Sequence, residues 1–309
     1  MEALTKAVLP DRVRGLLEGR LPEWIEPHWW MSEEELLAKA PLAEIGWFDL
    51  HAKSSPMEAI RLAHDLRWLN TEYTGVDWMP LDDLAQRGVV LTNGSGLTSI
   101  AVAEFAVMTM LAVAKDYRAV VRAQDRHEWL RAAPGTRELA GSRALVLGNG
   151  AIGKAVARML RAFDVSVDSV RSRDGDGWRD RVGNYDWIVL ALPGTSETRG
   201  LFDAPCIAAM KPDAVLVNFA RADVVNQDAL TRALADRRIA GAVLDLTDPE
   251  PLPPDHTLWS LDNCHITMHL SGIPTPASQE RAAERFLANC ALWQAGEELE
   301  AMVDLQRGY

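Results

Sequence analysis

Residues 144–153 read Ala-Leu-Val-Leu-Gly-Asn-Gly-Ala-Ile-Gly, and this stretch decides the fold of the second half of the chain. A short apolar run, 144–147, is followed at once by the glycine pattern and then by 154–163, which is rich in helix-forming residues. Strand, tight glycine turn and helix in this order are the fingerprint of a dinucleotide-binding unit. A glycine turn without a ligand is the alternative, and the strand–helix context disfavours it.

Each position of the glycine loop has its own task in such a unit. Gly148 allows the tight turn, Gly150 lets the backbone approach a pyrophosphate, and Gly153 lets the helix pack close to the strand. Ala151 and Ile152 begin the helix, whose N–H groups and positive dipole end face the phosphates. The loop therefore predicts a bound dinucleotide.

The residues after the next strand indicate which dinucleotide is bound. Asp168 follows Gly148 by 20 residues, near the spacing at which an acidic side chain contacts the ribose of NAD. It falls inside the alternating run 165–170, however, so we predict a mid-strand position. The strand ends at Arg171-Ser172-Arg173, where two guanidiniums and a hydroxyl can bind a 2′-phosphate. We therefore expect NADP(H) over NAD(H), with a solvated basic turn as the alternative.

Length and composition limit the remaining possibilities. A chain of 309 residues with 48% hydrophobic and 25% charged residues is typical of a globular protein with two domains. Its net charge of −12 disfavours nucleic acid and anionic membranes as partners. The three cysteines lack the spacing of a zinc site or a disulfide framework, so we expect no metal and a reducing compartment. Neither a basic leader nor a long apolar stretch occurs, which predicts a cytoplasmic protein.

Three side chains capable of chemistry follow apolar segments of the second half. Arg221 comes after 214–218, Glu250 after 240–244, and His269 after 264–268. Ligands of an open α/β sheet bind at the carboxyl ends of its strands. Hydride transfer to a carbonyl needs an acid, a group that tunes the acid and a cation for a substrate carboxylate. Taken singly, each residue could instead be a surface charge or a core histidine.

These segments resemble a known family, the D-isomer-specific 2-hydroxyacid dehydrogenases. Arg221 precedes Glu250 by 29 residues and Glu250 precedes His269 by 19, which is the order and spacing of that family. The matching stretches, which cover most of the chain, are LRWLNTEYTGVDWM, RGVVLTN, SIAVAEF, GNGAIGKAVARML, LPGTSETRGLF, VNFARADVV, AVLDLTDPEPLP and NCHITMHLSG.

The resemblance implies a role for each of the three residues. His269 would donate a proton to the ketone oxygen, Glu250 would hold the other imidazole nitrogen, and Arg221 would bind the substrate carboxylate. Gly75 and Val76 would offer backbone N–H groups to the same carboxylate. Further cofactor contacts are expected from residues on the adenosine side, Leu192, Pro193 and Thr198, and around the nicotinamide, Phe219, Ala220 and Asp245.

Six apolar segments with helix-length spacers predict a doubly wound parallel sheet in the second half. The segments are 143–147, 165–170, 187–192, 214–218, 240–244 and 264–268. With the resemblance, the predicted fold class is α/β with two Rossmann-like domains. A flavodoxin-like substrate domain would comprise 1–92, completed by 273–309, and a dinucleotide-binding domain 93–272. The helix expected at 275–295 would pack on the first domain, and a substrate cleft would lie between the domains.

The sequence departs from the family at two positions and leaves the substrate open. Ala222 replaces a glycine after the arginine, where its Cβ is expected to restrict the backbone. Met268 replaces a proline, which removes a rigid φ constraint. Glu250 disfavours the formate dehydrogenase relatives, which carry glutamine there. His51 is a weak further candidate at the border of the substrate cleft.

We expect a homodimer that reduces a small 2-oxo acid, with glyoxylate and hydroxypyruvate as first guesses. The apolar helix predicted near 101–114 is the expected dimer contact. A nucleotide-sensing regulator on the same fold is one alternative, and a dehydrogenase of a phosphorus or one-carbon acid is another.

Overall fold

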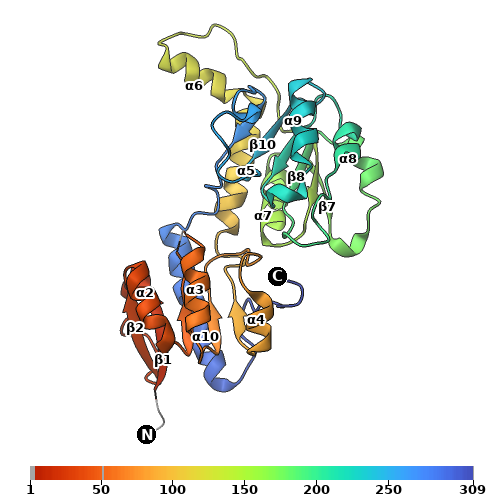
Figure 1. Ribbon diagram of the computed structural model, residues 1–309. Coiled ribbons are helices and arrows are strands. Elements are labelled where there is room, and N and C mark those ends of the chain that lie inside the picture. Colours follow the sequence, from red (N-terminus) through yellow and green to blue (C-terminus); the bar gives the residue numbers. More distant parts are fainter. Residues whose placement is uncertain (1–3, 51, 309) are drawn as a thin grey trace. The chain divides into compact units, whose positions relative to one another are not determined.

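The computed structural model describes residues 4–50 and 52–308. The chain forms two compact units, Met1–Thr98 with Pro274–Tyr309 (unit 1) and Ser99–Ile273 (unit 2) (Figure 1). The boundary predicted from the sequence lies at 92/93. Residues 93–98 stay with unit 1 because Asn93 donates its N–H to the carbonyl of Ala301 and Leu97 is buried in the core around the C-terminal helix. Unit 2 begins where helix α5 begins.

Unit 1 is built on a parallel sheet, sheet A, with the strand order β2-β1-β3-β4-β5. This is the flavodoxin-like order. The strands are β1 (Thr5–Pro10), β2 (Ile25–Trp30), β3 (Ile45–Trp47), β4 (Trp68–Asn70) and β5 (Val90–Thr92). One face packs on α2 (Glu33–Lys39), α3 (Ser54–Leu62) and α4 (Leu81–Gln86), and the other on α1 (Arg14–Leu17) and α10 (Pro276–Ala295).

No sequence pattern identified the first two strands of sheet A, β1 and β2. Strand β2 carries Pro27 and lies at the edge of the sheet, where a missing N–H is tolerated. The expectation for the C-terminal helix is confirmed. The ring of Phe286 on α10 lies 5.4 Å from that of Trp47 and 5.0 Å from that of Trp68, so α10 completes the core of unit 1.

Unit 2 contains a six-stranded parallel sheet, sheet B, with the order β11-β10-β9-β8-β6-β7. All six predicted strands are present and begin and end within two residues of the predicted bounds. They are β6 (Arg143–Leu147), β7 (Ser166–Val170), β8 (Trp187–Leu190), β9 (Val215–Asn218), β10 (Gly241–Leu244) and β11 (Cys264–Ile266). Helices α5 (Ser99–Ala114) and α7 (Ala151–Ala162) cover one face, and α8 (Ala204–Ala209) and α9 (Gln227–Ala235) cover the other. The doubly wound prediction is confirmed.

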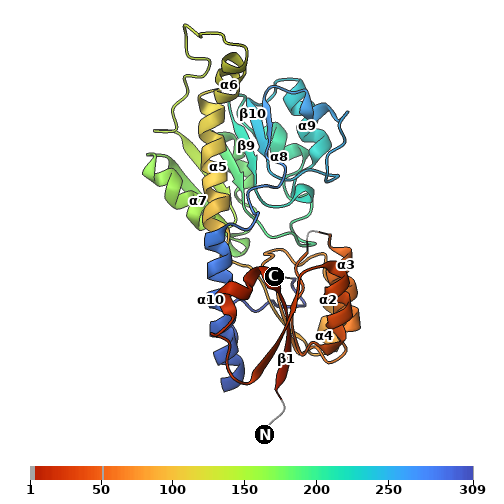
Figure 2. The same cartoon turned by 90° about the vertical axis from the view of Figure 1, so that its left-hand side faces the viewer.

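Helix α6 (Tyr117–Asp125) and the segment after it extend from the rest of unit 2 (Figure 2). Trp129 in this segment is 93% exposed. Among the described residues, none of the helices combines the length and apolar character needed to cross a membrane.

Candidate active site

The carboxyl ends of the strands of sheet B lie in one row. The pairing register aligns the final residues Val170, Leu147, Leu190, Asn218, Leu244 and Ile266. Each parallel crossover returns the chain to this edge, so segments far apart in sequence follow one another along it. The glycine loop follows β6, the basic turn follows β7, Arg221 follows β9, Glu250 follows β10, and His269 follows β11.

The glycine loop has the shape of a phosphate cradle. Gly148 has φ +106°, and a Cβ on it would lie 2.2 Å from the carbonyl oxygen of Ala191. A Cβ on Gly153 would lie 2.0 Å from the carbonyl oxygen of Gly148, because α7 packs against the loop. Gly150, the N-cap of α7, has open space around its Cβ position. Two glycines thus close the turn and the third leaves room for a ligand beside the helix N-terminus, which fits a dinucleotide pyrophosphate.

This loop lies at the point where the strand order of sheet B reverses, since β6 is flanked by β8 and β7. Ligands of doubly wound sheets bind at such a point. Leu192 and Pro193 follow β8, the strand beside β6. Leu192 is half-buried and Pro193 is exposed. The Thr198 hydroxyl donates to the carbonyl oxygen of Pro193 at 2.7 Å and accepts from the N–H of Thr195 at 2.9 Å. Thr198 therefore shapes the 193–198 loop.

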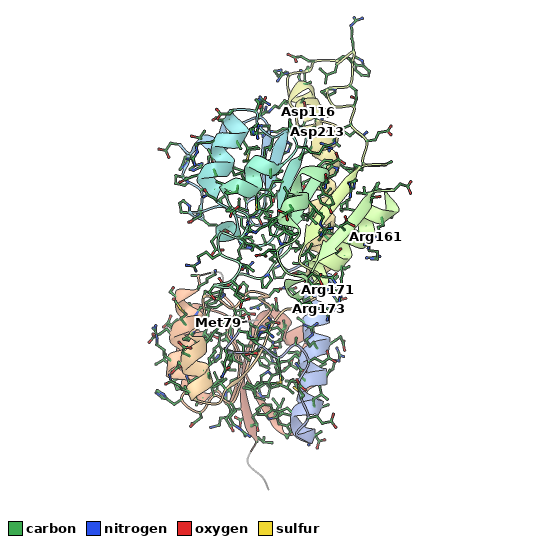
Figure 3. The ribbon with its side chains drawn as sticks, turned by 90° about the vertical axis from the view of Figure 1, so that its right-hand side faces the viewer. Met79, Asp116, Arg161, Arg171, Arg173 and Asp213 are labelled. Carbon is green, nitrogen blue, oxygen red and sulfur yellow. The ribbon has the colours of Figure 1, made fainter. Side chains whose placement is uncertain are left out.

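The basic turn contains an acidic residue, Asp174, whose contact with Arg171 was not predicted from the sequence. The Oδ2 atom of Asp174 accepts from the backbone N of Arg171 at 2.8 Å and from its Nε at 3.3 Å, and these bonds lower the pKa of Asp174. Arg171 and Arg173 lie close together, at the end of unit 2 away from Asp116 and Asp213 (Figure 3). The side chain of Ser172 is outside the described part of the structure. Asp168 is mid-strand, as predicted, and accepts from the Tyr185 hydroxyl at 2.6 Å.

His269 and Glu250 form a hydrogen-bonded pair. The Nδ1 atom of His269 lies 2.6 Å from Oε1 of Glu250, and both side chains are nearly half exposed. An ionised carboxylate only accepts hydrogen bonds, so Nδ1 carries the hydrogen and Nε2 is left for another partner. An imidazole held in this way can exchange a proton with a ligand through Nε2.

Two neighbouring residues, Asn218 and Gly194, determine the position of Arg221. The buried side chain of Asn218 donates to the carbonyl oxygen of Arg221 at 3.0 Å and accepts from the N–H of Ala220 at 3.0 Å. A Cβ on Gly194 would lie 2.7 Å from Cγ of Arg221. The arginine side chain can occupy this position only because residue 194 has no side chain. Phe219 and Ala220 are buried in the two cores of sheet B.

Ala222, which stands where the family has glycine, lies in an unstrained part of the backbone, and its expected effect on backbone freedom stays a prediction. Ala222 begins a 3-10 helix, Ala222–Val224, and any L residue adopts that conformation without strain. The glycine of the family is therefore not needed at this position.

The segment that carries His269 has an unusual backbone. Met268 and His269 have φ +53° and +56°. The left-handed region costs a residue with a Cβ roughly 1–2 kcal/mol, so the pair costs about 2–4 kcal/mol. Proline cannot adopt φ +53°, so Met268 permits a backbone here that the family's proline would not.

Asp245, which follows β10 directly, is 3% exposed and contacts this segment. Its Oδ1 accepts from the Thr267 hydroxyl at 2.5 Å, and its Oδ2 accepts from the Ser271 hydroxyl. Its backbone oxygen accepts from the N–H of His269 at 2.6 Å. Hydrogen bonds to a charged group contribute about 1.5–3 kcal/mol each, which is enough to offset the left-handed backbone.

The loop of Glu250 is held by Gln227, the first residue of α9. The side-chain Oε1 of Gln227 accepts from the N–H of Asp248 at 2.9 Å, and the Nε2 of Gln227 donates to the carbonyl oxygen of Asp248. Gln227, Asn218, Thr267 and Ser271 were not singled out from the sequence. The side chains of Gln227, Thr267 and Ser271 bond to neighbouring loops, and the sequence does not show such tertiary contacts.

The remaining predicted residues belong to unit 1. Gly75 and Val76 follow β4, and Val76 is fully buried. The Trp78 indole N–H donates to the carbonyl oxygen of Gly75 at 3.1 Å, which closes this turn. His51 lies outside the described residues. In the described ranges, no three His, Cys, Asp or Glu side chains form a group that could hold a metal ion.

Comparison with known proteins connects this geometry to a family. The model of the D-isomer specific 2-hydroxyacid dehydrogenase NAD binding domain matches residues 107–271. A glyoxylate reductase of Thermofilum pendens is 32% identical over 263 residues, which cover 80% of this chain and 77% of that protein. A D-3-phosphoglycerate dehydrogenase of Archaeoglobus fulgidus is 31% identical over 78% of this chain, which spans 48% of that longer protein.

A solved structure agrees over both units. The D-isomer specific 2-hydroxyacid dehydrogenase family protein from Aeromonas salmonicida has a TM-score of 0.86 and 26% identity, covering 98% of this chain and 100% of that chain. The family model alone covers more than half of the 309 residues. The chain therefore belongs to the D-isomer specific 2-hydroxyacid dehydrogenases, a family of NAD(P)-dependent oxidoreductases.

Proposed function

We propose that this enzyme uses NADPH to reduce a small 2-oxo acid, such as glyoxylate or hydroxypyruvate, to the D-2-hydroxy acid. The observation that carries the proposal is the pair formed by His269 and Glu250 at the ligand-binding edge of sheet B, with Arg221 after the adjacent strand β9. An acid held by a carboxylate, with a guanidinium after a neighbouring strand of the same sheet, matches what reduction of a 2-oxo acid requires.

In this proposal each side chain has one task. When bound, the dihydronicotinamide supplies the hydride that adds to C2 of the oxo acid. Protonated His269 gives the proton on Nε2 to the ketone oxygen, and Glu250 stabilises the imidazolium through Nδ1. Arg221 binds the substrate carboxylate and polarises the carbonyl. The hydride and the proton together convert the ketone to an alcohol, and His269 is left neutral until it takes a proton from solvent.

The same proposal gives the cofactor and the two units their roles. Unit 2 would bind NADPH through the glycine loop, with Arg171, Ser172 and Arg173 on the 2′-phosphate. Leu192, Pro193, Thr198, Phe219, Ala220 and Asp245 would complete the cofactor site. Unit 1 would serve as the substrate domain, with the backbone N–H groups of Gly75 and Val76 on the carboxylate.

The test is NADPH and NADH oxidation, followed at 340 nm, against glyoxylate, hydroxypyruvate and larger 2-oxo acids. We expect turnover with a small acid and higher kcat/KM with NADPH. His269→Asn should lower kcat by about 100-fold or more while NADPH binding is kept. His64→Asn, which changes an exposed histidine on another part of the chain, is the matched control and should leave kcat unchanged.

Each other outcome points elsewhere. A clear preference for NADH would contradict the assignment of the basic turn. NADPH binding without turnover on any 2-oxo acid would favour a nucleotide-sensing regulator. Turnover only in the oxidative direction, with D-3-phosphoglycerate or with a phosphorus or one-carbon acid, would show that this acid, and not a small 2-oxo acid, is the substrate.

We also propose that the enzyme is a cytoplasmic homodimer that associates through α5, α6 and the segment after α6. The support is a set of exposed apolar side chains on these elements: Met108, Tyr117, Val121, Trp129 and Leu130. Light scattering coupled to size exclusion should give the mass of two chains, and Val121→Glu with Trp129→Ala should give one. A wild-type monomer at micromolar concentration would contradict the proposal. Cell fractionation tests the location.

A further inference from the structure

We propose that Asp245, Thr267 and Ser271 form a hydrogen-bonded clamp that positions His269 for proton transfer. This inference rests on the proposed function. It gives a task to two hydroxyl side chains that have none in that proposal, and it gives Asp245 a task separate from cofactor binding. The three are positioning residues, because they act on the substrate through His269.

The clamp is symmetrical about the histidine in the sequence. Thr267 and Ser271 lie two residues before and two residues after His269, and their hydroxyls donate to the two oxygens of one carboxylate. Asp245 is 3% exposed and directly follows β10, so a rigid strand fixes its position. Both ends of the histidine segment are thereby tied to the same buried anchor.

The segment needs such an anchor because its own conformation is unfavourable. Met268 and His269 are consecutive left-handed residues, and neither is glycine. Besides the hydroxyl bonds, the N–H of Thr267 donates to Leu244 at 2.9 Å and the N–H of His269 donates to the backbone oxygen of Asp245 at 2.6 Å. The segment after β11 is therefore bonded to the end of the neighbouring strand β10, to whose loop Glu250 also belongs.

This arrangement sets the distance between the imidazole and its carboxylate partner. The backbone turn at 268–269 directs the ring so that Nδ1 meets Glu250 at 2.6 Å. If one hydroxyl is removed, one end of the segment is released and that contact lengthens. The imidazolium is then less stabilised, and the proton on Nε2 is no longer aimed at a fixed point. A displacement of this kind lowers the rate of the chemical step more than it lowers binding.

The experiment compares Thr267→Val, which keeps the shape and removes the hydroxyl, with Thr267→Ser, which keeps the hydroxyl. Ser271→Ala is the second variant, in case one substitution impairs folding. Steady-state kinetics with the best 2-oxo acid, the pH profile of kcat and the Kd of NADPH from fluorescence are measured for each. We expect Thr267→Val and Ser271→Ala to lower kcat by up to about 100-fold. NADPH affinity should be unchanged, and Thr267→Ser should restore kcat.

The proposal is overturned if Thr267→Val and Thr267→Ser have the same kcat. It is also overturned if the loss lies entirely in the Kd of NADPH, since Asp245 and the hydroxyls would then act on the cofactor. If the wild-type enzyme turns over no 2-oxo acid, the proposed function fails, and the clamp is tested by NMR. The His269 imidazole signal, assigned with His269→Asn, should shift in Thr267→Val and return in Thr267→Ser; an unchanged signal in both would refute the clamp.

Discussion

Restoring the family's proline before the histidine should inactivate this enzyme. Met268 has φ +53°, and proline fixes φ near about −65°, so Met268→Pro forces a rotation of about 118° at this residue. The rotation occurs one residue before His269, whose N–H is bonded to Asp245 and whose Nδ1 is bonded to Glu250. The new backbone path breaks at least one of these two bonds.

The size of the effect follows from the role of the pair. A positioned acid contributes about 100- to 10,000-fold to a rate, so we expect kcat to fall by about 100-fold or more. The Kd of NADPH should stay within a few-fold of the wild-type value, because the glycine loop follows a different strand, β6. Met268→Leu is the control for loss of the methionine side chain. Met268→Gly accepts the left-handed backbone and should keep both fold and kcat.

The assay is kcat by NADPH oxidation with the best 2-oxo acid, together with NADPH fluorescence for binding. If Met268→Pro were as active as Met268→Leu, with the same pH profile, the left-handed path of residues 268–269 would not describe the working enzyme. The explanation of the family departure would then be wrong.

Three further predictions use other contacts. Gly194→Ala places a Cβ against Arg221 and should lower kcat/KM for the oxo acid by about 10- to 100-fold, whereas Gly177→Ala, in open space, should not. Asp174→Asn removes a negative charge bonded to Arg171 and should raise kcat/KM for NADPH over NADH by about threefold, as for a screened surface charge; a fall would mean that this charge orients Arg171. Burial raises the pKa of Cys206 to about 11 and that of Cys264 and Cys290 to about 12. The thiolates should therefore form at pH 8 only on unfolding, and mass spectrometry should find alkylation only in denaturant; rapid labelling of the native protein would contradict this.

The sequence predicted sheet B well because four of its strands, β6, β8, β9 and β10, are buried on both faces. Such strands read as short, nearly continuous apolar runs, for example Val215–Asn218, and glycines mark the turn after β6. Sheet A was harder, since its edge strand β2 is buried only at its two end residues and contains Pro27. Such a strand shows neither a continuous apolar run nor a regular alternation.

The proposed reactive residues could be singled out from the sequence, whereas the residues that hold them could not. Arg221, Glu250 and His269 were singled out because each follows an apolar segment and because the family spacing links them. Gln227, Thr267 and Ser271 are ordinary polar residues, and each bonds to a partner that only the tertiary fold brings near. Asn218 bonds within its own loop, and no sequence pattern marks it. The backbone at 268–269 was also unpredictable, because no local residue signals a left-handed turn there.

The row of strand ends along sheet B has a consequence for how such an enzyme can change. The basic turn is supported within its own loop by Asp174, whereas Glu250 and His269 are bonded to each other and are held by Gln227 and Asp245. Substitutions on separately supported loops are expected to combine additively in free energy. Cofactor preference and acid–base chemistry can therefore be altered one loop at a time, and a variant that prefers the other dinucleotide need not lose its proton donor.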